Sequence, residues 1–150
     1  MINRSQLLKD LQGLLRRVEA DLLERSNLDT LPEVQASLRS EYEQAKQSER
    51  TALSYEEWRS DYAMHIGAAW ILSGVFVRFL EDNELIDPPL LAGTENRLQR
   101  ARDEYEQYFR SHPTETDREY LLAGFSKLAK LSGGAEIFGQ HNPVYEVPTC

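Results

Sequence analysis

Cysteine is almost absent from this chain of 150 residues, because the single one, Cys150, is the last residue. One thiol provides neither a disulfide framework nor a cluster of thiolate ligands for zinc or iron. We therefore expect a reducing, cytoplasmic setting. The opening residues, MINRSQLLKDLQ, carry charges where a secretory signal requires an uninterrupted apolar block, so we expect the mature protein to begin here.

Basic residues are in the minority. The chain has 17 lysines and arginines against 25 aspartates and glutamates, which gives a net charge of -8. A negative charge of this size repels phosphate backbones at long range and argues against a free-standing, nonspecific nucleic-acid binder. The total says nothing about a local basic patch. The length suits one domain with a core of its own.

The chain also lacks an uncharged run as long as a membrane span. Residues 66–77 carry no charge, but this stretch ends at Arg78 and is shorter than the roughly 20 residues that a spanning helix needs. A helix that is apolar on every side must be surrounded by other protein. The run therefore predicts a buried central helix and no membrane association.

Helical periodicity dominates the remaining sequence. Apolar residues recur at helical spacing between Leu7 and Leu22, which predicts an amphipathic helix over residues 4–25, capped by Asn3 or Ser5. Proline is favoured as the first residue of a helix, and a second helix is expected to begin at such a position. That residue is Pro32, and the inward face of its helix is predicted to hold Val34, Leu38, Tyr42 and Ala45.

Two capping boxes mark the starts of further helices. Ser54 is followed by Glu57, and Thr116 by Glu119, so that each hydroxyl and each carboxylate can accept from an orphaned backbone amide. Between the two helices that these boxes begin, another helix is expected to follow Thr94. The sequence thus predicts an all-α fold, a single compact bundle of about five helices around a central buried helix (about 54–83), with an extended C-terminal tail.

Candidate metal ligands are scattered. The three histidines lie far apart and near no carboxylate or thiol at metal-ligand spacing, so a metal site is not expected. An acidic cluster spans Glu81 to Asp87 and could hold a divalent cation, but it lacks the alternating spacing of a calcium loop. Arg78 can reach Glu81 or Asp82 one turn away, which favours a structural ion-pair network.

Arg97, Arg100 and Arg102 form the densest basic group in the chain. Arg97 and Arg100 share a helical face, and such a patch could contact DNA phosphates or a partner. Acidic residues are interleaved with it, which weakens the local field. A solvated face of mixed charge is therefore the alternative interpretation.

The segment Asn142-Pro143-Val144-Tyr145 is similar to the motif with which adenine amino-methyltransferases hold a flipped base. Val144 replaces the second proline of that motif. No glycine-rich turn between a strand and a helix precedes the segment, and no strands are predicted that could present it. We interpret it as a local turn, because a motif is confirmed only by its structural context.

Four segments together resemble the N-terminal region of the PglX-type adenine-specific DNA methyltransferases of BREX type 2 phage-defence systems. The resemblance covers essentially the whole chain, and it is most specific in VFVRFLEDNELI, in the tryptophan at Trp70 and in TDREYLLAGF. The segments are INRSQLLKDLQGLLRRVEADLLER, YEEWRSDYAMHIGAAWILSGVFVRFLEDNELI, TDREYLLAGFSKLA and IFGQHNPVYEVP.

The resemblance implies a helical accessory domain (1–138) and a tail (139–150) that leads into a catalytic region absent from this chain. The parent enzyme would use S-adenosylmethionine to methylate the N6 amine of adenine in host DNA. The chain would then be a noncatalytic domain that packs against the downstream methyltransferase region or other BREX proteins and helps to position DNA.

A stand-alone helical interaction protein, dimeric through its first helix, is the alternative. The possibility that the chain is itself an enzyme is left open, although no nucleophile, base and orienting partner can be assembled from its residues. We assign it no catalytic, cofactor-binding or metal-binding residue.

Overall fold

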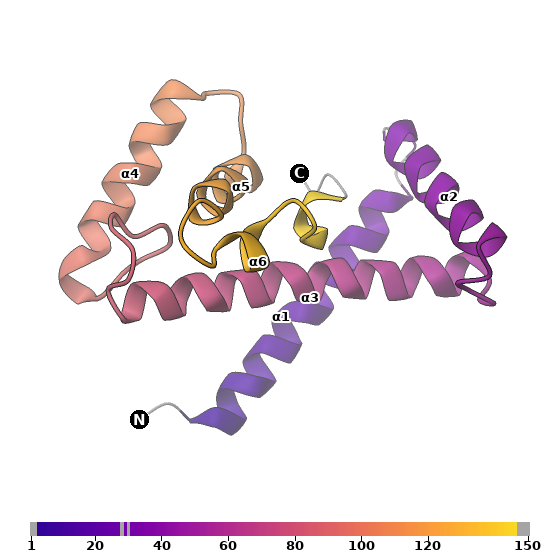
Figure 1. Ribbon diagram of the computed structural model, residues 1–150, viewed down its shortest axis with the longest axis horizontal. Coiled ribbons are helices and arrows are strands. Elements are labelled where there is room, and N and C mark those ends of the chain that lie inside the picture. The colour runs from indigo at the N-terminus through magenta and orange to yellow at the C-terminus, as the bar shows by residue number, and fades with distance from the viewer. Residues whose placement is uncertain (1–2, 28, 30, 147–150) are drawn as a thin grey trace. The chain divides into compact units, whose positions relative to one another are not determined.

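The computed structural model describes residues 3–27, 29 and 31–146 of the chain. This part contains six α-helices, two short 3₁₀ helices and no strand (Figure 1). The all-α prediction is confirmed, and the first five helices lie where the sequence placed them. In chain order the elements are α1 (Arg4–Ser26), α2 (Pro32–Gln47), α3 (Tyr55–Asp82), η1 (Glu95–Arg97), α4 (Leu98–Ser111), α5 (Asp117–Leu128), α6 (Ala135–Phe138) and η2 (Pro143–Tyr145).

Three helices, α1, α3 and α5, begin at predicted capping residues. The Asn3 side chain accepts a hydrogen bond from the backbone amide three residues later, at 3.1 Å. Before α3, the Ser54 amide donates to the Glu57 carboxylate at 3.0 Å, and the Glu57 amide donates back to the Ser54 hydroxyl at 3.4 Å. Thr116 and Glu119 form the same box before α5. Local sequence therefore sets the starts of these three helices.

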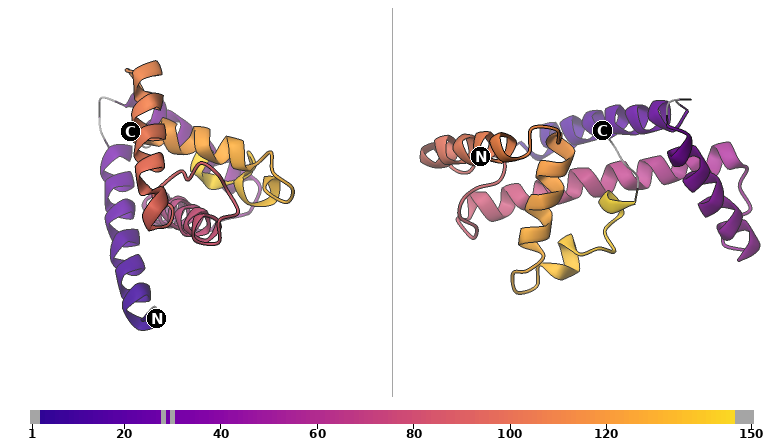
Figure 2. Two further views of the ribbon diagram at one scale, coloured as in Figure 1. Left: turned by 90° about the vertical axis from the view of Figure 1, so that its left-hand side faces the viewer. Right: turned by 90° about the horizontal axis from the view of Figure 1, so that it is seen from above.

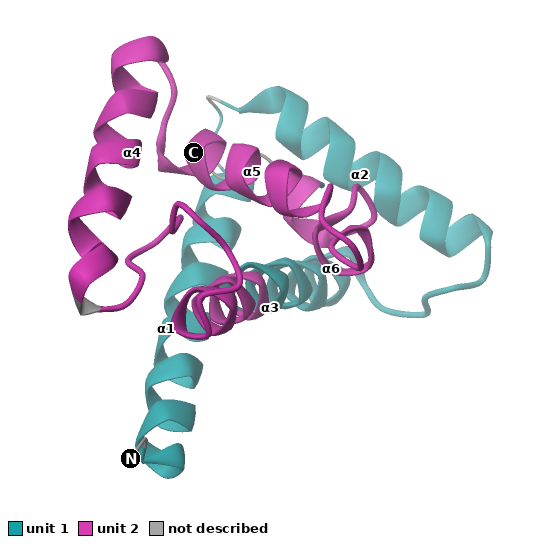
Figure 3. Cartoon of the chain, turned by 60° about the vertical axis from the view of Figure 1, so that its left-hand side comes forward, with its two compact units in different colours: residues 1–71, 146–149 teal, residues 72–145, 150 magenta. Residues whose placement is uncertain are grey.

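The chain divides into two compact units (Figure 3). Of the described residues, one unit holds those up to Ile71 together with Glu146, and the other holds residues 72–145. The first unit contains α1, α2 and the first part of α3. The second contains the end of α3 and the helices that follow it. A single helix therefore supplies residues to both units.

In the first unit, α1 crosses α3 at Gly67 (Figure 2). A Cβ atom on Gly67 would lie 3.3 Å from Leu15 Cδ1 and 3.4 Å from Val18 Cγ1, so glycine permits the close approach of the two helices. The core at the crossing consists of Leu22, Ala63 and Ile66, with Val18, Leu23, Tyr62 and Trp70 packed against it.

The predicted inward face of α2 is confirmed. Its central residue, Tyr42, has a ring centroid 5.4 Å from that of Tyr55 and 5.6 Å from that of Trp58. The Tyr42 hydroxyl donates to the Leu53 carbonyl at 3.0 Å, so the buried phenol keeps a hydrogen-bond partner. The buried residues of α2 are Val34, Leu38, Tyr42 and Ala45.

The second unit has its own core around Phe138. The Phe138 ring centroid lies 5.4 Å from that of Phe125 and 5.9 Å from that of Phe76. Val77 and Val144 are fully buried in the same unit. The short helix α6 was not expected from the sequence, and it brings Phe138 to the centre of this core.

One face of α3 departs from the prediction of a helix buried on every side. Leu72, Val75 and Phe79 are 66%, 42% and 53% exposed. On another face, Ser73 and Val77 are buried. The helix is apolar around its circumference over residues 66–77, but the described part of the chain covers only some of that surface.

By length and composition, α3 could cross a membrane, and 28% of the residues in its most apolar 18-residue window are buried within the chain. The sequence argument against a span rested on the twelve uncharged residues at 66–77. The helix is longer than that stretch because it continues through polar residues at both ends. The absence of a membrane partner stays a prediction.

The prediction of an extended tail is wrong for residues 139–145. They turn back and form η2, whose Val144 is fully buried. The Tyr145 hydroxyl donates to the Phe138 carbonyl at 3.2 Å. Val144, which the sequence assigned to the tail, therefore lies in the core of the second unit. Residues 147–150 lie outside the described part of the chain.

We predict that Trp70→Ala lowers the free energy of unfolding by about 2–3 kcal/mol, because Trp70 is only half-buried and a fully buried tryptophan costs roughly 3–5 kcal/mol. Urea unfolding followed by circular dichroism measures the loss. Leu72→Ala on the same helix is the control, with an expected change within about 0.5 kcal/mol because Leu72 is exposed. Equal losses in both variants would contradict the assigned packing.

Candidate functional site

Two of the three histidines contact nearby residues in the sequence. His112 Nδ1 lies 3.0 Å from the Tyr108 carbonyl oxygen, and its ring stacks on that of Tyr108. His141 Nε2 lies 3.0 Å from the Glu136 carbonyl oxygen. Within the described residues, no three side chains of histidine, cysteine, aspartate or glutamate are grouped so that they could hold a metal ion. His65 is exposed on α3.

The acidic cluster at the end of α3 is built around Glu81, whose side chain is fully buried. Three consecutive backbone amides donate to its carboxylate: Leu91 at 2.5 Å, Ala92 at 3.2 Å and Gly93 at 2.9 Å. Arg78 pairs with Glu81 at 2.8 Å. The predicted structural ion pair is confirmed, and the carboxylate also fills a nest of backbone amides that the sequence did not reveal.

The pKa of Glu81 results from opposing effects. Burial alone would raise it, but the three backbone hydrogen bonds and the charge of Arg78 outweigh burial and hold the pKa below the ordinary value of 4.5. Glu81 is therefore ionised at neutral pH. This buried, ionised carboxylate serves here to fix the chain between α3 and α4.

Of the predicted DNA contacts, Arg97 is the least available. Its side chain is only 11% exposed. One nitrogen donates to the Glu81 carbonyl at 3.3 Å, and the other donates to the Ile86 carbonyl and to Asp87. Arg97 thus holds the segment that follows α3, and its donors are directed into the protein.

Arg100 and Arg102 differ from Arg97. Arg100 is 56% exposed in its side chain and pairs with Asp87 at 2.9 Å. Asp87 therefore brings Arg97 and Arg100 together, as their shared face predicted, and both cations pair with an exposed carboxylate of the same chain. Arg102 is exposed and forms no ion pair with another described residue.

The Asn142-Pro143-Val144-Tyr145 segment forms a local turn, as interpreted from the sequence. The Asn142 side chain accepts from the Val144 amide at 3.1 Å and donates to the Ile137 carbonyl at 2.8 Å. It also donates to the Ser73 hydroxyl at 3.1 Å. Both ends of the amide are used within the protein, so none is presented to a base.

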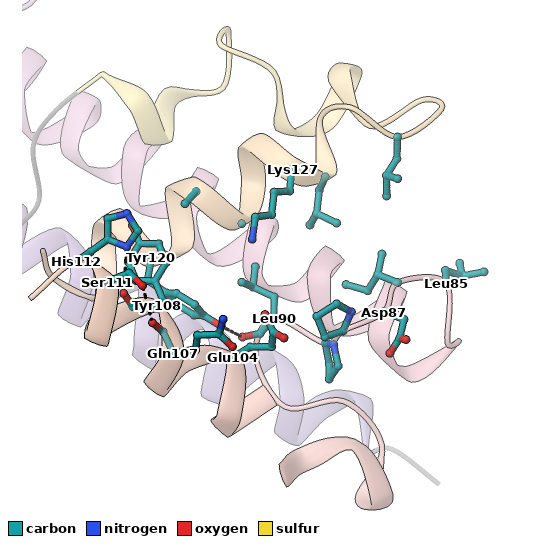
Figure 4. Close-up of a pocket in the computed structure, with 17 residues that line it drawn as sticks. Leu85, Asp87, Leu90, Glu104, Gln107, Tyr108, Ser111, His112, Tyr120 and Lys127 are labelled. Atoms are coloured by element: carbon teal, nitrogen blue, oxygen red, sulfur yellow. Dashed lines mark hydrogen bonds between the residues drawn. The ribbon is translucent and has the colours of Figure 1, made fainter. Parts of the chain in front are cut away.

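A groove with a cavity volume of about 620 Å³ lies in the second unit (Figure 4). Its walls are residues 85–90, the face of α4 from Glu104 to His112, and the face of α5 that continues to Leu131. Its lining includes four leucines, two prolines and an alanine, and Lys127 is also among the residues that line it (Figure 4). Sequence reasoning missed this site, because segments far apart in the chain line it.

Two features fix the groove's wall to α5. The Tyr120 hydroxyl donates to the Leu90 carbonyl at 2.9 Å. Gly124 lies so close to Leu90 that an added Cβ atom would come within 2.5 Å of both Leu90 methyl carbons. Across the groove, burial and a hydrogen bond to Glu115 raise the pKa of Tyr108 to about 12, so its phenol is neutral at physiological pH. The groove is therefore preformed.

Apolar side chains outside the groove are also exposed. On α3 they are Leu72, Val75 and Phe79, which we call the α3 apolar face. On α1, Leu7, Leu8 and Leu14 are 44%, 57% and 41% exposed. Exposed apolar groups gathered on one helix face are typical of surfaces that contact another protein.

The comparisons give one informative relative. The chain is 39% identical over 150 residues to the adenine-specific methyltransferase PglX of Streptomyces coelicolor, and the match covers 99% of this chain. It covers only 12% of that protein. The match confirms the resemblance seen in the sequence, and its extent is consistent with one N-terminal region of a larger protein. No protein-family profile and no solved structure matches the chain.

We predict that Glu81→Gln lowers the free energy of unfolding at pH 7 by about 1–3 kcal/mol, because one acceptor oxygen is lost from a buried network. The pKa of Glu81 is depressed on folding, so its contribution is present above its ordinary value of 4.5 and is lost as pH falls through the folded pKa. Urea unfolding between about pH 3 and pH 7 should therefore show a weaker acid dependence in the variant.

The control is Glu84→Gln, which changes an exposed carboxylate two residues beyond α3. It should leave both the stability at pH 7 and its acid dependence close to those of the original chain. An unchanged acid dependence in Glu81→Gln would mean that Glu81 is not the group whose ionisation stabilises this region.

Proposed function

We propose that the chain is a noncatalytic, helical N-terminal domain of an adenine-specific DNA methyltransferase that acts in BREX-type phage defence. One observation carries the proposal: 99% of the chain matches PglX, while only 12% of PglX is matched. The identity runs through the whole chain, so the region corresponds to one continuous part of that larger protein. On this proposal the parent acts in the cytoplasm.

The distribution of side chains supports a noncatalytic role. The buried carboxylate of Glu81 is consumed by backbone amides, and the amide of Asn142 is consumed by a turn. These are the two groups that a sequence search would first consider for chemistry. We therefore propose that S-adenosylmethionine binding and methyl transfer belong to the remainder of the parent protein. That remainder makes up most of the parent's length.

The α3 apolar face supports a role in packing against that remainder. Leu72, Val75 and Phe79 expose large side chains along one side of a helix in the second unit. Burial of such a side chain contributes roughly 1.5–3 kcal/mol. We propose that the methyltransferase region, or another protein of the defence system, covers this face. Because residues 139–145 are folded, we also extend the proposed domain to residue 146.

A stand-alone interaction module is the second candidate, and the exposed leucines of α1 favour it. Leu7, Leu8 and Leu14 lie in the half of α1 before its crossing with α3. A second copy could cover them by helix pairing. Sedimentation of the 150-residue chain discriminates the two candidates, because the stand-alone interaction module requires a dimer.

We predict that Phe79→Ser changes the stability of the isolated chain by less than about 0.5 kcal/mol, because its ring is half exposed there. In the longer methyltransferase, the same substitution should increase hydrogen exchange of α3 and lower the melting temperature. The control is Leu53→Ser, an exposed apolar residue in the loop before α3. Equal effects of Phe79→Ser in the short and long proteins would argue against packing at this face.

DNA positioning is a further part of the proposal, and Arg102 is the residue that carries it, since Arg97 is used internally. We predict that Arg102→Glu weakens DNA binding by the longer methyltransferase and lowers the slope of its salt dependence by about 1. Arg110→Glu, at an exposed site on the same helix, is the control for the change in net charge. Identical salt slopes in the two variants would remove Arg102 from the DNA contact.

A further inference from the structure

The first half of α1 concentrates positive charge in an otherwise acidic chain. Residues 4–17 hold four lysines and arginines and one carboxylate, which gives this segment a net charge of +3. The whole chain carries -8, so the remaining residues carry -11. Charge divided so unevenly along a chain is typical of a segment that contacts an anionic partner.

Three of these cations lie on one side of the helix. Arg16 and Arg17 follow Lys9 by seven and eight positions, which places all three within one arc of a helix. Their side chains are exposed, and none forms an ion pair with another described residue. The one carboxylate beside this arc, Asp10, accepts a hydrogen bond from the Gln6 side chain at 2.8 Å. The arc therefore presents three accessible cations.

The other carboxylates of α1 lie in its later turns. They are Glu19, Asp21 and Glu24, and Asp21 pairs with Arg25 at 2.8 Å. Glu19 follows Arg16 by one turn, but the two form no ion pair in the described structure. The helix thus has a basic first half and an acidic second half.

The apolar side of α1 is used by its own chain where the helix crosses α3. Leu15 and Val18 approach Gly67, and Leu22 is buried in the same core. The cations lie on the opposite side of the helix, away from α3. A helix that binds a membrane surface must lay its apolar side on the lipid. Because α3 occupies that side from Leu15 onward, the arrangement argues against a membrane as the anionic partner.

The residue types on the basic side favour a phosphate backbone. We call this side the α1 polar face. Between residues 5 and 17 it carries no large apolar side chain, whereas protein interfaces have an apolar centre. Lysine, arginine, serine and glutamine are the residue types that contact DNA phosphates. The α1 polar face consists of Ser5, Gln6, Lys9, Gln12, Gly13, Arg16 and Arg17.

Gly13 lies in the middle of the α1 polar face. A Cβ atom there would meet no atom within 4 Å, so packing within the chain does not require glycine at this position. Glycine inside a helix lowers stability relative to alanine. Its lack of a side chain leaves room for a partner's backbone to approach the helix between Lys9 and Arg16.

We propose that the α1 polar face binds the phosphate backbone of duplex DNA through Lys9, Arg16 and Arg17. These residues span about 12 Å of helix, and duplex DNA carries one phosphate per roughly 1.7 Å of its axis, so each cation can contact a different phosphate. Backbone contacts of this kind position DNA without reading its sequence. The inference rests on the proposed function and adds a second contact to the one at Arg102.

The salt dependence of DNA affinity tests the contact in the longer methyltransferase. Each phosphate contact adds about 0.9 to the slope of log affinity against log salt. The triple variant Lys9→Gln, Arg16→Gln and Arg17→Gln should therefore lower the slope by about 2–3, measured by fluorescence anisotropy of a labelled duplex. Glutamine is a good helix former, and circular dichroism of the variant shows whether α1 is retained. An unchanged slope would overturn the proposal.

The matched control removes three exposed cations elsewhere, by Arg50→Gln, Arg110→Gln and Lys130→Gln. It makes the same change in net charge and should lower the slope by less than about 1. Equal effects of the two triple variants would mean that the loss follows from net charge, and the α1 polar face would not be the contact.

A variant without any charge change locates the contact more closely. Gly13→Leu adds bulk where the structure leaves open space, so it should weaken DNA binding without lowering the melting temperature. Unaltered DNA affinity in Gly13→Leu would contradict a close approach of the DNA backbone at this face.

Two further measurements separate the possible failures. Transfer of labelled methyl groups to duplex DNA by the unaltered longer protein tests the proposed function, and its absence would refute that function. If methyl transfer is present but the salt slope of the α1 triple variant is unchanged, only the α1 contact is refuted. Binding of the chain to phosphatidylserine vesicles that is lost in the triple variant, with DNA affinity unaltered, would assign the face to a membrane and overturn the proposal.

Discussion

The buried carboxylate of Glu81 is the interaction on which the second unit depends. Three consecutive amides, from Leu91 to Gly93, point at it, and Arg78 lies beside it. An unpaired charge in this position would be costly, so the segment after α3 must adopt the conformation that satisfies it. The same segment carries Asp87, which binds Arg97 and Arg100, and the prolines that form one wall of the groove. One ionised group thus organises the connection from α3 to α4.

This arrangement determines what the nearby arginines contact. A sequence count places three arginines within six residues and suggests a positive surface, yet Arg97 directs its donors to the Glu81 and Ile86 carbonyls and to Asp87. Arginine suits this task because its planar group donates in several directions at once. The positive charge left near η1 and α4 is smaller than the sequence indicates. Basic density along a chain is therefore a weak guide to a nucleic-acid surface when carboxylates fold back onto it.

Local sequence signals were sufficient to predict the helices, but they did not predict which residues pack against each helix. The Thr116 and Glu119 box and the inward face of α2 could be predicted, because neighbours in sequence determine them. The exposure of Leu72 could not, since a helix apolar on all sides does not reveal how many partners its own chain supplies. The groove also escaped prediction, because it depends on Leu90 meeting Gly124, more than thirty positions later. Val144 was assigned to a tail because its pattern carries no helical period.

The uninterrupted course of α3 has a consequence for how this region can be inherited. The boundary between the compact units falls between Ile71 and Leu72, inside a helix of 28 residues. Recombination at that point would leave each half with a severed helix whose exposed turns have lost their hydrogen-bond partners. Gene fusions and exchanges that preserve function should therefore carry both units together, and the region behaves as one evolutionary module even though its core is divided.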